Sequence, residues 1–158
     1  IEKHNLNRTP FRLVDVDELK VLAMGKLMYE RRSGLAIRVF DKRIEEIPKT
    51  LLEEIKETEI VVDCRDMKTP LPFEHPKIYY LAYDGEYITF GFNVDYTKLW
   101  DDGTGESGYT ITPSFLVPPL LLSLLVILHY NYTPDKRIFK RVHVKRFIEL
   151  LEEVKEDG

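Results

Sequence analysis

The chain has 158 residues, a net charge of −4 and a single cysteine, and 44% of its residues are apolar. This length and composition are typical of one folded domain over 1–158 and exclude a chain that is mostly disordered. Because Cys64 has no second cysteine to pair with, an internal disulfide is excluded and a reducing, cytoplasmic setting is expected.

Two further features of the composition bear on habitat and membranes. The chain contains no glutamine, and avoidance of thermolabile amides is typical of thermophilic proteins. No signal peptide is apparent at its start. The longest apolar run, FLVPPLLLSLLVIL over 115–128, is shorter than the about 20 residues that cross a bilayer. We therefore expect no contact with a membrane.

The first half of the chain predicts two helices, each followed by a strand. Apolar residues spaced three and four apart predict a helix over 15–33, and a proline near its start favours a helix over 47–57. Alternating, β-branched LAIRVFD predicts a strand over 35–41, and EIVVDCRD predicts another over 59–66. The three prolines of 68–76 then indicate an extended linker.

The second half predicts a hairpin and two more helices. Asp84-Gly85 lies between alternating apolar runs and predicts a two-residue turn. The apolar run that contains Pro118 and Pro119 predicts a buried helix, and YTPDKRIFKR is interpreted as a basic connector. The predicted elements are strands over 77–83 and 86–93 and helices over 117–130 and 143–156.

These elements predict an α+β fold with a four-stranded, largely antiparallel sheet and about four helices. The helix between strands 35–41 and 59–66 would make those two strands parallel, whereas the hairpin is antiparallel. One face of the sheet is expected to pack on the helices. The other face is expected to form an open cleft lined by aromatic and basic side chains.

Residues 77–100 hold eight aromatic rings, which the hairpin distributes over both faces of the sheet. Side chains alternate between faces along a strand, and the turn at Asp84-Gly85 pairs Ala82 with Tyr87. The predicted core face carries Tyr79, Leu81, Tyr83, Ile88, Phe90 and Phe92. The second face carries Ile78, Tyr80, Ala82, Tyr87, Thr89 and Gly91.

The second face is the predicted binding surface, because rings and guanidinium groups coincide there. Flat rings accept any nucleobase, at roughly 1–3 kcal/mol per base, while guanidinium groups contact phosphates. The bases of a single strand are unstacked and available, so the expected partner is single-stranded DNA or RNA. The predicted members of the surface are Phe40, Tyr80, Tyr87, Trp100, Arg38 and Arg65.

Positive charge is concentrated in two segments of this acidic chain. Residues 1–43 have a net charge of +4, and residues 134–146 have a net charge of +5. Clustered charge, more than total charge, decides where an anion docks. Further phosphate contacts are therefore expected from Arg31, Arg32, Lys42, Arg43, Lys136, Arg137, Lys140 and Arg141.

Each of these features also has an ordinary structural interpretation. Tyrosine fits a half-buried strand, so other side chains could cover Tyr80 and Tyr87, and Arg65 could pair with Asp63. Exposed rings could instead be the hot spots of a protein–protein assembly module. Asp63 and Asp66 could serve a metal-dependent nuclease, although strand 86–93 lacks the acidic-x-Lys pair of restriction-type nucleases.

Catalytic and cofactor motifs find little support. The four histidines are scattered, and His129, near the end of the apolar helix, is expected to be a hydrogen-bonded structural residue. The chain has neither GxGxxG nor GxxxxGK[ST]. We predict a protein that is not an enzyme and needs no cofactor or metal.

The two last helices raise the prospect of self-association. Helix 143–156 places Val144, Phe147, Leu151 and Val154 at spacings of three and four, but it is too short to hold a coiled coil alone. It is either the start of a dimerising coil over 143–158 or a helix packed on the domain. A homodimer through this helix or through helix 117–130 is the corresponding expectation.

The order of these elements resembles ThermoDBP, the single-stranded-DNA-binding family of hyperthermophilic archaea. The matching features are RVF at 38–40, YYLAYDGEY at 79–87, the two basic segments, the absence of glutamine and the helix that begins VHVKRF. The resemblance implies an archaeal protein that binds single-stranded DNA with little sequence preference, through an aromatic cleft with a basic rim. It further implies base stacking on Phe40, Tyr80, Tyr87 and Trp100 and phosphate contacts from Arg38 and Arg65. The family's C-terminal dimerising coil is longer than the heptad pattern found here.

Overall fold

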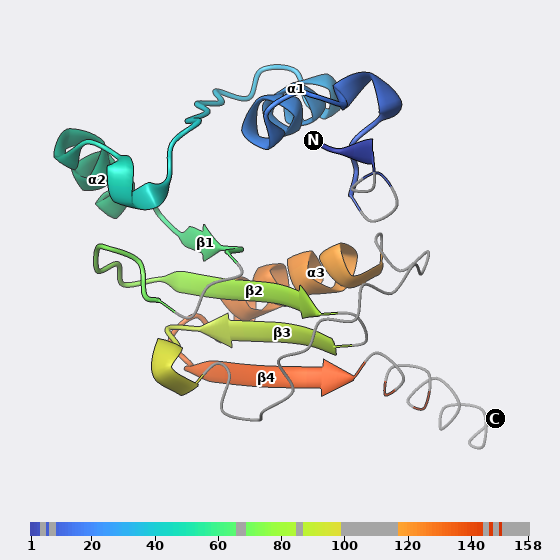
Figure 1. Ribbon diagram of the computed structural model, residues 1–158. Helices are drawn as coiled ribbons and strands as arrows, with labels where there is room; N and C mark the ends of the chain where they lie inside the picture. Colours follow the sequence, from blue (N-terminus) through green and yellow to red (C-terminus); the bar gives the residue numbers. More distant parts are fainter. Residues whose placement is uncertain are drawn as a thin grey trace. The chain divides into compact units, whose positions relative to one another are not determined.

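The computed structural model describes residues 1–3, 6, 9–65, 69–84, 87–98, 117–143, 146 and 149. Contacts divide them into two compact units, the first ending at Ile47 and the second beginning at Pro48. The first unit contains α1, and the second contains α2, α3 and the sheet (Figure 1). The prediction of a single domain over 1–158 stays a prediction.

Helix α1 (Lys20–Arg31) is shorter at its start than the predicted helix over 15–33. Two residues before it explain the difference. The buried Asp15 ends a 3-10 turn and accepts a hydrogen bond of 2.7 Å from the backbone N–H of Arg12. Asp17 has a φ of 70°, in the left-handed region that a right-handed helix cannot contain. The helix therefore begins after this kink.

Residues 35–41 form no strand, so the prediction of a strand there is wrong. The segment has no regular secondary structure and belongs to the first unit, where Val39 packs on α1. A Cβ placed on Gly25 of α1 would lie 2.9 Å from Cγ1 of Val39. This close approach needs a glycine in the helix, which explains a residue that otherwise lowers helix propensity.

The second unit begins with α2 (Lys49–Lys56) and the short strand β1 (Val61–Asp63), as the sequence predicted in outline. The proline-rich linker that follows is anchored back to this pair. His75 is buried, and its Nε2–H donates a hydrogen bond of 2.8 Å to the carbonyl of Thr58. The linker therefore returns the chain so that β2 (Ile78–Asp84) runs parallel to β1.

The sheet is four-stranded and mixed, in the order β1-β2-β3-β4. Strands β2 and β3 (Tyr87–Phe92) form the predicted antiparallel hairpin, but in a register that differs from the prediction by two residues. Asp84 pairs with Tyr87, and positions 85 and 86 between them lie outside the described residues. A shift of two residues leaves every side chain on its predicted face, because the side-chain period of a strand is two.

The fourth strand is β4 (Ile138–His143), which lies antiparallel to β3 at the edge of the sheet. The interpretation of this segment as a basic connector is therefore wrong. Two hydrogen bonds of the buried His129 fix the position of the chain just before β4 begins. The Nε2–H of His129 donates to the carbonyl of Lys136 at 2.7 Å, and its Nδ1 accepts from the hydroxyl of Tyr79 at 3.0 Å. His129 is thus the hydrogen-bonded structural residue that was expected.

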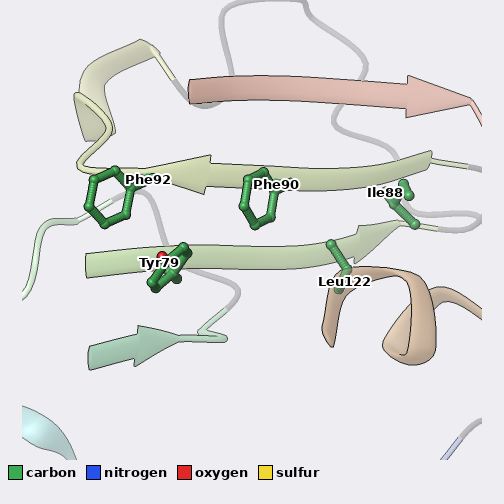
Figure 2. Packing of buried hydrophobic residues seen from close by; sticks show 5 residues of the cluster. All are labelled: Tyr79, Ile88, Phe90, Phe92 and Leu122. Carbon is green, nitrogen blue, oxygen red and sulfur yellow. The ribbon is translucent and has the colours of Figure 1, made fainter. Parts of the chain in front are cut away.

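The core lies between the sheet and α3 (Val117–Tyr132), which confirms a helix at 117–130. The prediction that this helix is buried is wrong for one of its sides: Leu122 is buried, but Leu120, Leu124, Ile127 and Leu128 are exposed, because only one side of the helix packs on the sheet. Figure 2 shows four sheet residues of this core together with Leu122 of α3. The predicted core face is confirmed, since its members Tyr79, Ile88, Phe90 and Phe92 are all buried. Among the described residues, no helix is both long and apolar enough to cross a membrane.

Three sequence predictions fall wholly or mostly outside the described residues. Trp100 is one of them, so its proposed place at the rim stays a prediction. The helix predicted over 143–156 and the dimerising coil over 143–158 are described only at His143, Arg146 and Glu149. His143 is the last residue of β4, so the described start of that segment is a strand.

Candidate functional site

The second face of the sheet is partly covered by the chain that leaves β3. Asn93 reverses the chain there, with a φ of 49° in the left-handed region that asparagine tolerates. Its backbone N–H donates to the carbonyl of Ile78 at 2.8 Å, and its Oδ1 accepts from the N–H of Ile78 at 2.9 Å. Its Nδ2 also donates to the carbonyl of Pro76. Residues 94–98 are thereby directed across the sheet.

Glycine at position 91 lets this covering segment approach the sheet closely. A Cβ built on Gly91 would lie 2.5 Å from Cγ1 of Val94, closer than two carbon atoms tolerate. Any larger residue would displace Val94 and, with it, the turn that contains Tyr96 (η4, Tyr96–Lys98). Gly91 therefore has a packing role on the second face.

Tyr80 lies under this covering segment and is 1% exposed. Its ring and that of Tyr96 meet edge to face, with centroids 5.9 Å apart. The prediction that Tyr80 projects into open solvent is therefore wrong. Alternation within a strand fixes the face on which a ring lies, but the tertiary path of residues 93–98 fixes what covers it.

A buried carboxylate holds the covering segment in place. Asp63, at the end of β1, accepts hydrogen bonds from Nε and Nη2 of Arg65 at 3.0 and 3.1 Å. It also accepts one from the hydroxyl of Tyr96 at 2.8 Å. Burial alone would raise the pKa of Asp63, but the hydrogen bonds from Arg65 and Tyr96 outweigh it and lower that pKa below its usual value.

The same cluster determines the role of Arg65. Its guanidinium also donates to the carbonyl of Thr69 at 2.9 Å, so three of its hydrogen bonds go to protein oxygens. The alternative interpretation, in which Arg65 pairs with Asp63, is confirmed. Burial and the hydrogen bond to Asp63 in turn raise the pKa of Tyr96. We assign Asp63, Arg65 and Tyr96 a structural role in closing this end of the face.

The other end of the second face has a different character. Tyr87 is half-buried, and its register partner on β4 is His143, whose ring meets it edge to face at 4.9 Å. The Cζ atom of Arg141 lies 4.8 Å from the centroid of the Tyr87 ring. On the same face, Phe139 is 41% exposed. Tyr87, Phe139, Arg141 and His143 thus form an aromatic and basic strip, which we call the β4 strip.

Strand β4 carries positive charge on both of its faces. Arg141 lies on the face of Tyr87, whereas Lys140 pairs with Phe90 and lies on the face of α3. Lys136 and Arg137 are exposed and immediately precede the strand. Four of the predicted phosphate contacts therefore gather around one edge strand, although Lys140 lies on the face opposite to the one predicted.

The predicted site residues of the first unit are exposed but lie outside the sheet. Arg38 lies over the ring of Phe40, with its Cζ 5.5 Å from the ring centroid. Because residues 35–41 are not a strand of the sheet, the prediction that Arg38 and Phe40 share its second face is wrong. The other predicted phosphate contacts of this unit are also exposed: Arg31 and Arg32 around the end of α1, and Lys42 and Arg43.

Sequence reasoning missed Phe139 and His143 as members of the surface. Part of the signal was present, because IFKRVH contains the β-branched and aromatic residues that favour a strand, although its apolar and basic residues do not alternate strictly. These residues were instead assigned to a basic connector and to the helix that was predicted after it. The covering role of Tyr96 left no comparable signal, since it depends on the reversal at Asn93.

Within the described part of the chain, no group of three histidine, cysteine, aspartate or glutamate side chains could hold a metal ion. Asp63, a residue of the nuclease alternative, is occupied by Arg65 and Tyr96, and Asp66 lies outside the described residues. Comparison of the chain with protein-family models, with curated proteins and with solved structures finds no match.

Proposed function

We propose that this protein binds single-stranded nucleic acid, with single-stranded DNA as the first candidate, along the β4 strip and with little sequence preference. The observation that carries the proposal is the stack of Arg141 on Tyr87, beside the exposed ring of Phe139, on a basic edge strand. Rings and guanidinium groups in alternation are the features that bind bases and phosphates of a single strand.

The proposed binding surface differs from the one expected from sequence in the residues that contact the nucleic acid. Phe139 is the exposed ring of the strip, and the half-buried ring of Tyr87 lies under the guanidinium of Arg141. Lys136 and Arg137 extend the charge beyond the start of β4. Tyr80 has no direct part, because its ring is buried.

Binding is expected to depend strongly on salt. Cations that contact about three or four phosphates release a similar number of counterions, so log K should fall with log salt at a slope of about −2 to −3 for single strands. Fluorescence anisotropy with labelled single- and double-stranded oligonucleotides over a salt series tests this expectation. Equal affinity for duplex, or affinity that does not change with salt, would contradict the proposal.

A matched pair of variants locates the surface. Phe139→Ala removes a ring that is 41% exposed on β4, and Phe40→Ala removes one that is 39% exposed in the first unit. We expect Phe139→Ala to weaken binding by roughly 1–3 kcal/mol, the value of one base stack, and Phe40→Ala to change it little. A larger loss of affinity in Phe40→Ala than in Phe139→Ala would show that the binding surface lies in the first unit.

Self-association is a second candidate function, favoured by one observation on α3. Its side chains at spacings of three and four include exposed apolar residues, a pattern that commonly marks a contact surface. Sedimentation of the chain over a concentration series tests a homodimer, and Leu124→Glu should dissociate it. The exposed residues of this row are Leu120, Leu124, Ile127 and Leu128.

A further inference from the structure

A groove of about 980 Å³ lies between α3 and β4, on the face of the sheet opposite to Tyr87. It shares Phe139, Lys136 and Arg137 with the proposed nucleic-acid surface, which leaves its floor and its α3 wall without a role. Ile88 and Phe90 of β3 lie at its base, and both are almost fully buried. Its remaining apolar lining comes from α3 and β4 and consists of Leu125, Leu128, Tyr132, Ile138, Phe139 and Val142.

The accessible lining of this groove is both aromatic and aliphatic: Tyr132 is 78% exposed and Phe139 is 41% exposed. Leu128 of α3 is 43% exposed at its wall, and Leu125, Ile138 and Val142 are each partly exposed. Bases gain their affinity by stacking on ring faces, whereas most of the apolar lining here is aliphatic, namely Ile88, Leu125, Leu128, Ile138 and Val142. Aliphatic walls instead favour aliphatic side chains of a ligand, through burial worth about 25 cal/mol per Å².

Four cations surround this apolar floor: Lys136, Arg137, Lys140 and Arg146. Among the described residues that line the groove there is no carboxylate, and none of these four cations forms an ion pair with another described residue. An occupant with several negative charges therefore fits the rim. A ligand with a single carboxylate, such as a fatty acid, would neutralise only one of them.

We propose that the groove between α3 and β4 binds an acidic, amphipathic peptide segment of a partner protein. Leucine-like side chains of the segment fill the floor, and its glutamate or aspartate side chains meet the four cations at the rim. Both requirements arise from the same hollow: the floor selects apolar groups, and the rim selects multiple negative charges. The proposal does not depend on the binding of nucleic acid by the β4 strip.

The test uses a labelled synthetic peptide of leucine and glutamate, about 15 residues long, with leucine at helical spacings of three and four. Two control peptides replace every glutamate by lysine or every leucine by serine. Anisotropy with the full chain should show that both controls bind at least about tenfold more weakly than the acidic amphipathic peptide. Equal binding of either control would overturn the proposal.

A pair of neighbouring substitutions assigns the binding to the groove. Leu128→Glu places a carboxylate in the groove wall and should weaken the acidic peptide about tenfold or more. Ile127→Glu makes the same change on the preceding residue of α3, which is 58% exposed and does not line the groove. It should have little effect on the affinity for the peptide. Lys140→Glu, at an exposed rim residue, provides a second variant should Leu128→Glu unfold.

The same variants separate this proposal from the proposed function. Tyr87→Ala, on the opposite face, should weaken an oligonucleotide and leave the peptide unaffected. If Leu128→Glu abolishes oligonucleotide binding while the peptide fails to bind, the groove belongs to nucleic acid and the peptide proposal is overturned. Loss of the peptide in Ile127→Glu as strongly as in Leu128→Glu would also overturn it, because binding would then follow the charge of the helix and not the groove.

Discussion

Tyr80 and Tyr87 lie on the same face of one hairpin, yet their surroundings are opposite in kind. Tyr80 is sealed under Tyr96 beside a buried carboxylate, whereas Tyr87 is half-buried beside Arg141 and His143. The strand pattern treats the two residues as equivalent. The difference teaches that exposure on a sheet face is determined by what the connecting segments do after the strands have formed.

The physical origin of the difference is the short segment that follows β3. Asn93 binds back to the first residue of β2, so Val94 and Tyr96 fall over the end of the face that contains Gly91 and Tyr80. Tyr87 begins β3, at the far end of that strand. Its neighbours come from the edge strand β4 instead.

The largest expected effect separates the two tyrosines directly. Tyr80→Ala removes a buried ring and should lower the free energy of unfolding by about 3–5 kcal/mol. Tyr87→Ala removes a half-buried ring and should lower it by only about 1 kcal/mol. Urea denaturation of both variants measures the difference, and similar losses would show that the two ends of the face are equally packed.

The second prediction concerns the carboxylate that holds the cover over Tyr80. Asp63→Asn removes the charge that accepts hydrogen bonds from Arg65 and Tyr96. We expect a loss of about 1.5–3 kcal/mol in the free energy of unfolding, the value of hydrogen bonds to a charged group. Asp95→Asn, at an exposed carboxylate of the same covering segment, is the matched control and should change stability little, because asparagine keeps the Oδ1 that accepts hydrogen bonds from the N–H and the hydroxyl of Thr97.

The pH dependence of stability provides an independent measure of the same carboxylate. Because the folded protein lowers the pKa of Asp63, the group stabilises the fold fully above its unfolded pKa of about 3.9. That contribution is lost as the pH falls through the folded pKa. The stability difference between wild type and Asp63→Asn should therefore shrink between pH 5 and more acidic values, and a difference that stays constant would contradict this assignment.

A smaller effect is expected at the glycine beneath the cover. Gly91→Ala places a Cβ against Val94 and should reduce stability by about 1–2 kcal/mol, as overpacking does. Combining it with Val94→Ala should restore part of the loss, because the second change makes room for the first. A double-mutant cycle by thermal or urea unfolding measures this coupling, and strictly additive losses would show that the two residues do not interact.

The smallest effect on stability is expected at the open end. Arg141→Gln removes the cation above the Tyr87 ring and should reduce the free energy of unfolding by only about 0.5–1 kcal/mol. Its effect on oligonucleotide affinity should be larger than its effect on stability, because a phosphate contact is lost as well. Chemical denaturation and anisotropy on the same variant test this contrast, and a loss confined to stability would assign Arg141 to packing alone.

Two segments show why only part of the site was predictable. AIRVF at 36–40 and IFKRVH at 138–143 both combine β-branched, aromatic and basic residues, and either sequence suits a strand. A strand also needs a partner edge for its backbone hydrogen bonds. Residues 138–143 lie along β3, anchored by His129, whereas Val39 packs against Gly25 of α1. Local pattern could not decide between them.

By itself, the sequence determined the α+β class, the helices around 20–31, 49–56 and 117–132, and the face on which each hairpin side chain lies. These follow from local periodicity, which the chain carries within about ten residues. The tertiary structure decided which basic segment completes the sheet, the hairpin register and the sealing of Tyr80. Those outcomes depend on contacts between residues distant in sequence, such as Asp63 with Tyr96 and Tyr79 with His129. No local pattern encodes such pairings, because each partner alone has many equivalent alternatives.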